Sequence, residues 1–197
     1  MKPSKKIVTI MAVLAIAIVA TAMAIPSLVG QPAHANTMVL KFDVAEDATR
    51  FVFDEAPVFD DGLPAYGNAF VTSGYLYEHG ILNSSNGVLP DGSPEFPDKV
   101  VGSWICRGWF IGDGAHTESG AVVVTTQYFQ IGDEPGGETI ITDGVEIVDL
   151  NKVGYRAITG GTGEYSNARG QGSQVLLGLN QTEGVNLRFE LSVATRP

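Results

Sequence analysis

Apolar and polar residues alternate with a period of two along much of the chain after residue 35. The clearest case is the last segment, where Val185, Leu187, Phe189, Leu191 and Val193 alternate with mainly polar residues. Such alternation turns one face of a β-strand towards a core and the other towards solvent or a partner. No window after residue 35 combines an apolar period of 3.6 with capping signals, so the pattern predicts an all-β domain.

Clusters of Gly, Asp, Asn and Pro separate the alternating segments and predict about eight strands with short connections. The turn sequence at residues 132–137 indicates that the strands before and after it pair with each other. The longest connection, residues 82–99, is polar, and we expect either a surface loop at one mouth of the domain or a disordered segment. The expected strands are residues 38–44, 66–77, 100–111, 121–131, 139–148, 153–159, 171–177 and 185–193, with residues 50–53 extending or restarting the first.

The predicted strands favour a closed antiparallel β-barrel. Closure satisfies the hydrogen bonds of the edge strands, and the 24 glycines of the chain allow the coiling that a small barrel requires. Cys106 is the single cysteine, so no internal disulfide can stabilise the domain. A β-sandwich is the structural alternative, because counting strands does not separate the two architectures.

The first 35 residues have the composition of an export signal. Lysines at positions 2, 5 and 6 precede an apolar run over residues 7–25, and two Ala-x-Ala sequences end at Ala24 and Ala35. We therefore expect a signal helix in residues 1–35, with cleavage after Ala24 or, preferably, Ala35, and one secreted or periplasmic domain in residues 36–197. The alternative is an uncleaved N-terminal anchor that holds the domain outside the cytoplasm, because the apolar run is long for a signal.

The charge of the mature chain argues against nucleic-acid and membrane partners. Removing three of the 12 basic residues and none of the 22 acidic residues leaves a formal charge of −13. Such a protein repels the phosphates of nucleic acids and the headgroups of anionic lipids. We therefore expect no nucleic-acid partner, and no membrane partner after the signal is cleaved.

The most distinctive string is residues 155–170, Tyr-Arg-Ala-Ile-Thr-Gly-Gly-Thr-Gly-Glu-Tyr-Ser-Asn-Ala-Arg-Gly. It resembles a segment shared by plant dirigent proteins and allene oxide cyclases, in which a strand ends in Gly-Gly-Thr/Ser-Gly and an Ala-Arg-Gly-like piece opens the next strand. The aromatic segment 125–133, the strand at 139–144 and the closing strand at 187–193 resemble the same family in the same order. The resemblance covers residues 120–194 well and residues 37–112 loosely.

This resemblance implies an eight-stranded antiparallel closed barrel with an apolar lumen, often assembled as a homotrimer. The family's cyclases close an epoxide derived from a fatty acid, its dirigent proteins steer the coupling of phenoxy radicals, and related bacterial barrels catalyse ring formation. All of them fold a substrate into a reactive shape in a dry cavity. The resemblance transfers no catalytic residue, because the spacing of Pro64, Asn68 and Glu78 does not reproduce the cyclase pattern.

The expected function is therefore an exported barrel that binds a small hydrophobic compound in its lumen and orients or cyclises it. If the protein is an enzyme, it is an isomerase or cyclase that acts by preorganising its substrate. The alternative is a non-catalytic exported barrel that serves as a structural or oligomerising scaffold. A lumen with apolar walls and one or two buried polar groups favours the first hypothesis, and a lumen plugged by aromatic side chains favours the second.

Six residues in the predicted strands are candidates for lining the lumen, although one sequence does not show which strand face points inward. The glycine-rich turn Gly160-Gly161-Thr162-Gly163 is interpreted as structural, because no Lys-Ser/Thr and no helix follow it as a phosphate-binding loop requires. The lumen candidates are Phe70, Trp104, Cys106 and Tyr128, with Arg107 or Arg188 as a charged group.

Other chemistry has little support in the sequence. His79 and His116, the two histidines after residue 35, have no spacing relative to carboxylates that indicates a metal site. No Gly-x-Ser-x-Gly sequence of a hydrolase nucleophile elbow occurs. We therefore expect no metal and no cofactor.

Overall fold

The structure, a computed structural model, describes residues 36–195, which form one antiparallel sheet with four short 3-10 turns. The expected signal segment, residues 1–35, lies outside the described residues. No helix within residues 36–195 has the length and apolar character needed to cross a membrane. The strands are β1 (Asn36–Glu46), β2 (Val52–Phe53), β3 (Ala69–Glu78), β4 (Val100–Phe110), β5 (Ala121–Ile131), β6 (Glu138–Ile147), β7 (Val153–Gly161), β8 (Arg169–Leu179) and β9 (Val185–Thr195).

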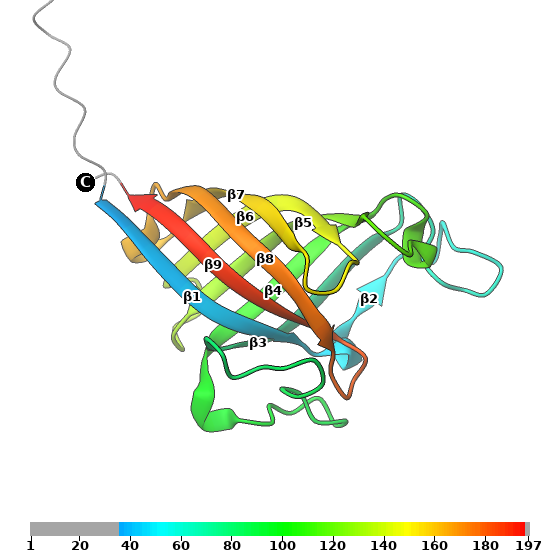
Figure 1. Cartoon of the computed structure of the whole chain (residues 1–197), viewed down its shortest axis with the longest axis horizontal. Helices are drawn as coiled ribbons and strands as arrows, with labels where there is room; N and C mark the ends of the chain where they lie inside the picture. The colour runs from blue at the N-terminus through cyan, green and yellow to red at the C-terminus, as the bar shows by residue number, and fades with distance from the viewer. Residues whose placement is uncertain (1–35, 196–197) are drawn as a thin grey trace, which may run out of the picture. The chain divides into compact units, whose positions relative to one another are not determined.

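Eight of these strands close into a barrel. Each strand from β3 to β9 pairs with the next one along the chain, and β1 pairs with both β9 and β3. The β1–β3 pairing, from Phe42↔Glu78 to Glu46↔Gly74, completes the ring that Figure 1 shows from the side. The closed barrel predicted from the sequence is therefore confirmed, and the sandwich alternative is wrong.

The predicted strands lie within a few residues of the observed ones, except near the N-terminal end. Residues 50–53 form part of a 3-10 turn (Ala48–Arg50) and the two-residue strand β2, which pairs with the start of β3. The β3 strand begins at Ala69 rather than at residue 66, because the preceding Asn68 makes turn contacts. Its side-chain amide donates hydrogen bonds to the carbonyl oxygens of Asp54 and Pro57, at 2.9 and 2.8 Å.

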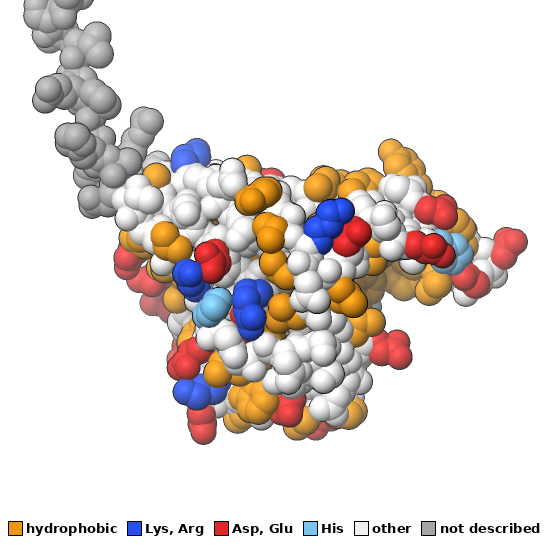
Figure 2. All heavy atoms as spheres, viewed as in Figure 1, with side chains coloured by type: hydrophobic (Ala, Val, Ile, Leu, Met, Phe, Trp, Pro, Cys, Tyr) orange, Lys and Arg blue, Asp and Glu red, His pale blue; other side chains and the backbone are white. Residues whose placement is uncertain are grey.

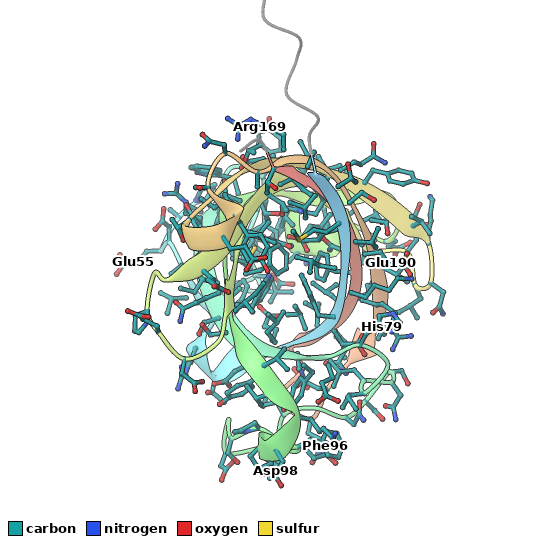
Figure 3. The ribbon with its side chains drawn as sticks, turned by 90° about the vertical axis from the view of Figure 1, so that its left-hand side faces the viewer. Glu55, His79, Phe96, Asp98, Arg169 and Glu190 are labelled. Carbon is teal, nitrogen blue, oxygen red and sulfur yellow. The ribbon has the colours of Figure 1, made fainter. Side chains whose placement is uncertain are left out.

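Aromatic side chains fill one end of the lumen. Phe42, Phe129 and Phe189 pack with ring centroids 4.9 to 5.7 Å apart, and all three are buried. Buried Tyr165, from the 3-10 turn Gly163–Tyr165, belongs to the same core. Figure 3 views the barrel end-on, with side chains filling the ring and the labelled Arg169, Glu190 and His79 on its outside.

The long connection between β3 and β4 covers the outside of the barrel and does not form a mouth. Its buried Leu82 and Val88 form a second small core with Ala45 of β1 and Tyr77 of β3. Partly buried Ile81 and Phe96 pack against this core, so a polar segment without apolar periodicity is still held against the sheet. Figure 1 shows the connection below β1 and β3.

Asp43, on the outer face of β1, ties this connection to β9. Its carboxylate accepts hydrogen bonds from the backbone N–H groups of Gly80 and Leu82, both at 2.9 Å. It also receives a bidentate pair from Arg188 of β9, at 2.8 and 2.9 Å. Arg188 in turn donates to the Leu82 carbonyl at 3.0 Å, so the arginine joins the barrel wall to the loop.

Candidate functional site

The other end of the barrel contains a cavity of about 210 Å³. It lies where β3 begins and β4 ends, and half-buried Val122, Val148 and Leu176 form part of its lining. The wall is mainly apolar, with a few polar side chains along one part of it. The apolar lining includes Phe51, Phe70, Trp104, Phe110, Val123, Val185 and Leu187, and the polar lining is Glu46, Thr72, Cys106, Glu146 and Gln174.

Glu146 of β6 is the centre of a hydrogen-bond network. Its Oε1 atom accepts hydrogen bonds from Thr125 Oγ1 at 2.6 Å and from Gln127 Nε2 at 2.8 Å. Its Oε2 atom accepts a hydrogen bond from Gln174 Nε2 at 2.9 Å. Three side-chain donors therefore hold the Glu146 side chain in one position in the lumen.

Arg156 of β7 supplies the positive charge beside Glu146. Its side chain is fully buried, and its Nη1 atom lies 3.7 Å from Glu146 Oε1. The guanidinium also donates hydrogen bonds to Thr142 Oγ1 at 3.0 Å and to the Thr125 carbonyl at 2.9 Å. Burial lowers the pKa of Arg156, and the Glu146 carboxylate opposes that shift.

Glu46, at the end of β1, has much less compensation. Its Oε2 atom accepts one hydrogen bond, from the Val185 N–H at 2.9 Å, and no cation among residues 36–195 pairs with it. The Thr72 hydroxyl lies close enough to the carboxyl to lower its pKa, but it does not satisfy hydrogen-bond geometry. Burial is the largest effect and raises the pKa of Glu46, and the negative charge of Glu146 adds to the increase.

Buried polar atoms without a hydrogen-bond partner concentrate in the lumen. Within residues 36–195, the buried side-chain atoms without a hydrogen-bond partner are Thr72 Oγ1, Trp104 Nε1, Gln127 Oε1 and Arg156 Nη1. Thr72 and Trp104 line the cavity, and the other two belong to the Glu146 network. Buried polar groups without partners are uncommon in folded proteins, and a bound ligand or water commonly supplies the partner.

Cys106 also lines the cavity, with its Sγ atom 3.6 Å from Glu146 Oε1. Burial raises the pKa of the thiol well above its ordinary value, and the Glu146 carboxylate raises it further. The thiol therefore stays protonated and behaves as a small, weakly polar part of the wall.

Three of the six lumen candidates line this cavity, namely Phe70, Trp104 and Cys106. Tyr128 and Arg107 lie on the outer face of the barrel instead. Each of them stands between two inward-facing residues of its strand, so its own side chain points outward. The Arg107 guanidinium stacks 5.9 Å from the Tyr128 ring centroid, and it lines a groove on the outer wall next to Trp109.

Arg188 is the third candidate whose expected position differs from the observed one. It projects from the outer face of β9, since its neighbours Leu187 and Phe189 point into the lumen, and it pairs with Asp43. The alternation of buried and exposed residues decides all three placements, and this alternation becomes unambiguous only when the closed sheet is known.

The carboxyl groups and amides of the lumen were not among the residues predicted from the sequence to line it. Glu46 continues the inward series of Phe42 and Val44, and Gln127 stands between inward-facing Thr125 and Phe129. A polar residue on the apolar face of an alternating strand was the available signal. It would have indicated Glu46 and Gln127, but not Glu146, whose strand has a weaker pattern.

The glycine-rich turn at the closed end has a conformational role. A Cβ atom at Gly161 would lie 2.5 Å from the carbonyl oxygens of Thr139 and Tyr165, and Gly163 has a φ of +57°. Thr162 Oγ1 accepts a hydrogen bond from the Thr139 N–H at 3.1 Å and donates to the Gly137 carbonyl at 2.9 Å. Gly160 and Gly161 are the last residues of β7, so the motif turns the chain at the closed end of the barrel, opposite the cavity.

The two histidines of the described chain lie outside the lumen. His79 is exposed, and His116 stacks on Phe59 with its Nε2 atom 2.9 Å from Asp61 Oδ2. Figure 2 shows acidic side chains beside a histidine on the projecting loops at its right-hand side. No group of three or more His, Cys, Asp or Glu residues within residues 36–195 is arranged to hold a metal ion.

The barrel has the fold of dirigent proteins. The pterocarpan synthase dirigent protein PsPTS1 superposes with a TM-score of 0.58 at 19% identity, over 82% of this chain and 97% of that one. The pterocarpan synthase dirigent protein GePTS1 superposes with a TM-score of 0.56 at 20% identity, over 87% of this chain and 95% of that one. Comparisons with protein-family profiles and with curated protein sequences found no match.

Proposed function

We propose that this protein binds a small, mainly apolar compound in the lumen of its barrel and orients or cyclises it there. The observation that carries the proposal is the cavity of about 210 Å³, whose aromatic and aliphatic wall contains only a few polar groups. Binding sites for small molecules have this composition. Because an apolar cavity of about 150 Å³ admits benzene, the lumen suits a compound of one or two rings.

The lumen also contains groups that can transfer protons. Glu46 and Glu146 place two carboxyl groups on the same cavity wall, and carboxyl groups act as proton donors and acceptors in general acid–base catalysis. Rigid apolar walls around them would hold a flexible substrate in one conformation, which lowers the entropic barrier to ring closure. The same fold in two pterocarpan synthase dirigent proteins agrees with a substrate-orienting role.

The proposed compartment is outside the cytoplasm, where the signal-like residues 1–35 would direct the domain. Expression of the full chain in a bacterial host, followed by fractionation and intact-mass analysis, tests this part. Export with loss of residues 1–35 or 1–24 supports cleavage, and an exported protein of full mass supports the N-terminal anchor. Retention of the whole chain in the cytoplasm contradicts export.

Native mass spectrometry tests the binding role. The purified protein is expected to carry a small molecule or to bind members of a panel of one- and two-ring compounds. The variant Val148→Trp places a large side chain in the cavity lining and is expected to abolish binding. The control Val39→Trp alters an exposed residue on the outer wall of β1 and should leave binding intact. Equal binding by both variants, or no binding by the unaltered protein, would contradict the proposal.

The scaffold alternative also has an observation in its favour. Trp109, Val124 and Val145 lie directly opposite one another on β4, β5 and β6, and their side chains are 40 to 52% exposed. We propose that this row contributes to a homotrimer interface, since exposed apolar rows on a sheet mark interaction surfaces. Sedimentation equilibrium should give a trimer that Trp109→Lys dissociates and Val39→Lys does not. A monomer at micromolar concentration would rule the interface out.

A further inference from the structure

The two carboxyl groups of the lumen have unequal surroundings. Glu146 receives three hydrogen bonds and lies beside Arg156, so the fold itself balances its charge. Glu46 receives one hydrogen bond and no cation, although the residue is only 6% exposed. A buried carboxylate without a counter-charge is unstable, so either a proton or a ligand must neutralise Glu46.

The surroundings of Glu46 favour a cation over an anion. With both carboxyl groups ionised, the lumen groups Glu46, Glu146 and Arg156 carry a net negative charge. The other charged neighbour is Asp47, whose carboxylate is already paired with Arg50 at 3.1 Å. The cavity residue Cys106 stays a neutral thiol.

The aromatic wall suits the same kind of ligand. Phe51, Phe70, Phe110 and Trp104 line the cavity together with Glu46. The face of an aromatic ring attracts a cation, and clusters of aromatic rings are a recurrent way to bind substituted ammonium groups. The acidic chain as a whole raises the local concentration of cations, because its formal charge is −10 even with the N-terminal lysines included.

We propose that the lumen selects small apolar compounds that carry an ammonium group, and that Glu46 binds this group. The inference rests on the proposed function, since it names the ligand class of the same cavity. The apolar part of the ligand lies against the aromatic wall, and the ammonium group donates hydrogen bonds to the Glu46 carboxylate. Carboxylate ligands are rejected by Glu46 and Glu146.

Three compounds of nearly equal shape test the inference by calorimetric titration at pH 8. They are 2-phenylethylamine, 2-phenylethanol and phenylacetate, which carry a cationic, a neutral and an anionic head group on the same apolar part. The amine is expected to bind about tenfold more tightly than the alcohol, which corresponds to one charge-assisted hydrogen bond. Phenylacetate is expected to bind more weakly than the alcohol.

Matched variants assign the preference to Glu46. Glu46→Gln is expected to reduce the amine preference to about threefold or less while the alcohol still binds. Glu118→Gln removes the same charge from an exposed position and should preserve the tenfold preference. Val148→Trp should abolish binding of the amine, which separates lumen binding from attraction to the acidic surface.

The unaltered protein supplies a second readout that does not depend on a variant folding. Because Glu46 must lose its proton to bind an ammonium group, the amine preference should increase from pH 4 to pH 8, with proton release on binding. Equal affinity for amine and alcohol, or a preference that survives Glu46→Gln, would overturn the ammonium inference and leave the proposed function standing. Failure of all three compounds to bind would overturn both.

Discussion

Glu46 and Glu146 occupy one lumen but are held in different ways. Glu146 is part of a network of Thr125, Gln127 and Gln174 side chains, which resembles a structural polar core. Glu46 has a single backbone donor and belongs to the cavity wall. Both groups line the cavity, but the fold supplies three hydrogen bonds to Glu146 and only one to Glu46.

Protonation of Glu46 links the stability of the empty protein to pH. Its folded-state pKa lies above the ordinary value of 4.5, so the native state retains a proton that the unfolded state releases. The contribution of Glu46 to stability is therefore lost as the pH rises from about 4.5 to the raised value. The Glu46→Gln variant does not undergo this loss. The free energy of unfolding of the variant minus that of the unaltered protein should therefore increase between pH 4 and pH 8.

Urea denaturation at several pH values measures this effect. Groups with lowered pKa values, such as Asp61, Asp91 and Asp149, change stability in the opposite direction, but they are present in both proteins and cancel in the difference. Glu118→Gln is the control and should show a difference that does not depend on pH. A constant difference for Glu46→Gln would show that Glu46 has an ordinary pKa in the folded protein.

Arg156 is expected to be the main electrostatic support of the lumen. Arg156→Met leaves Glu146 partly buried without its counter-charge and should reduce the free energy of unfolding by about 3 kcal/mol. Arg107→Met, on the exposed outer face, should change it by less than about 0.5 kcal/mol. Equal effects of the two substitutions in urea denaturation would contradict the role given to the Arg156–Glu146 pair.

Among the elements, the connection between β3 and β4 depends on a contact that is distant in sequence. Arg188 of β9 holds Asp43 of β1, and Asp43 holds the backbone of Gly80 and Leu82. Arg188→Met should leave the buried Asp43 carboxylate without its cation and destabilise the connection by about 3 kcal/mol. Amide hydrogen exchange should then accelerate at Gly80 and Leu82 much more than in β5. Unchanged protection at Gly80 and Leu82 would contradict this account.

The elements themselves were largely predictable from the sequence, because period-two alternation depends only on one face of each strand being buried. The hairpin of β5 and β6 follows directly from the turn at residues 132–137, with Ile131 paired to Glu138. Residues 50–53 were harder, since the short β2 strand is defined by its pairing with β3 and not by an apolar pattern. The position of the β3–β4 connection depends on contacts with Asp43 and Arg188 that local sequence does not reveal.

The site was predictable only in part. Phe70, Trp104 and Cys106 stood out as unusual strand residues and do line the cavity. Arg107 and Arg188 were selected because a charged group in the lumen was expected, but their strand positions place them outside. The charged groups of the lumen are instead Glu46, Glu146 and Arg156. These residues lie near one another only because the sheet closes into a barrel.

At the scale of the whole molecule, the barrel has two unequal ends. The aromatic cluster of Phe42, Phe129 and Phe189 closes one end, as a scaffold would require, and the cavity occupies the other, as a binding protein would require. Each half of the lumen therefore agrees in part with one of the two expectations, although five polar residues line the cavity where one or two were expected. Under the proposed function, the filled half would hold the cavity wall in a fixed arrangement around a bound compound.

A crystal structure of the protein grown with 2-phenylethylamine tests the central claim most directly. We expect β1 to pair with β3 and the compound to lie in the lumen between Phe70 and Trp104, with its nitrogen within hydrogen-bond distance of Glu46. An open sheet in which β1 and β3 are apart, or a closed barrel whose lumen is filled by protein side chains alone, would contradict it.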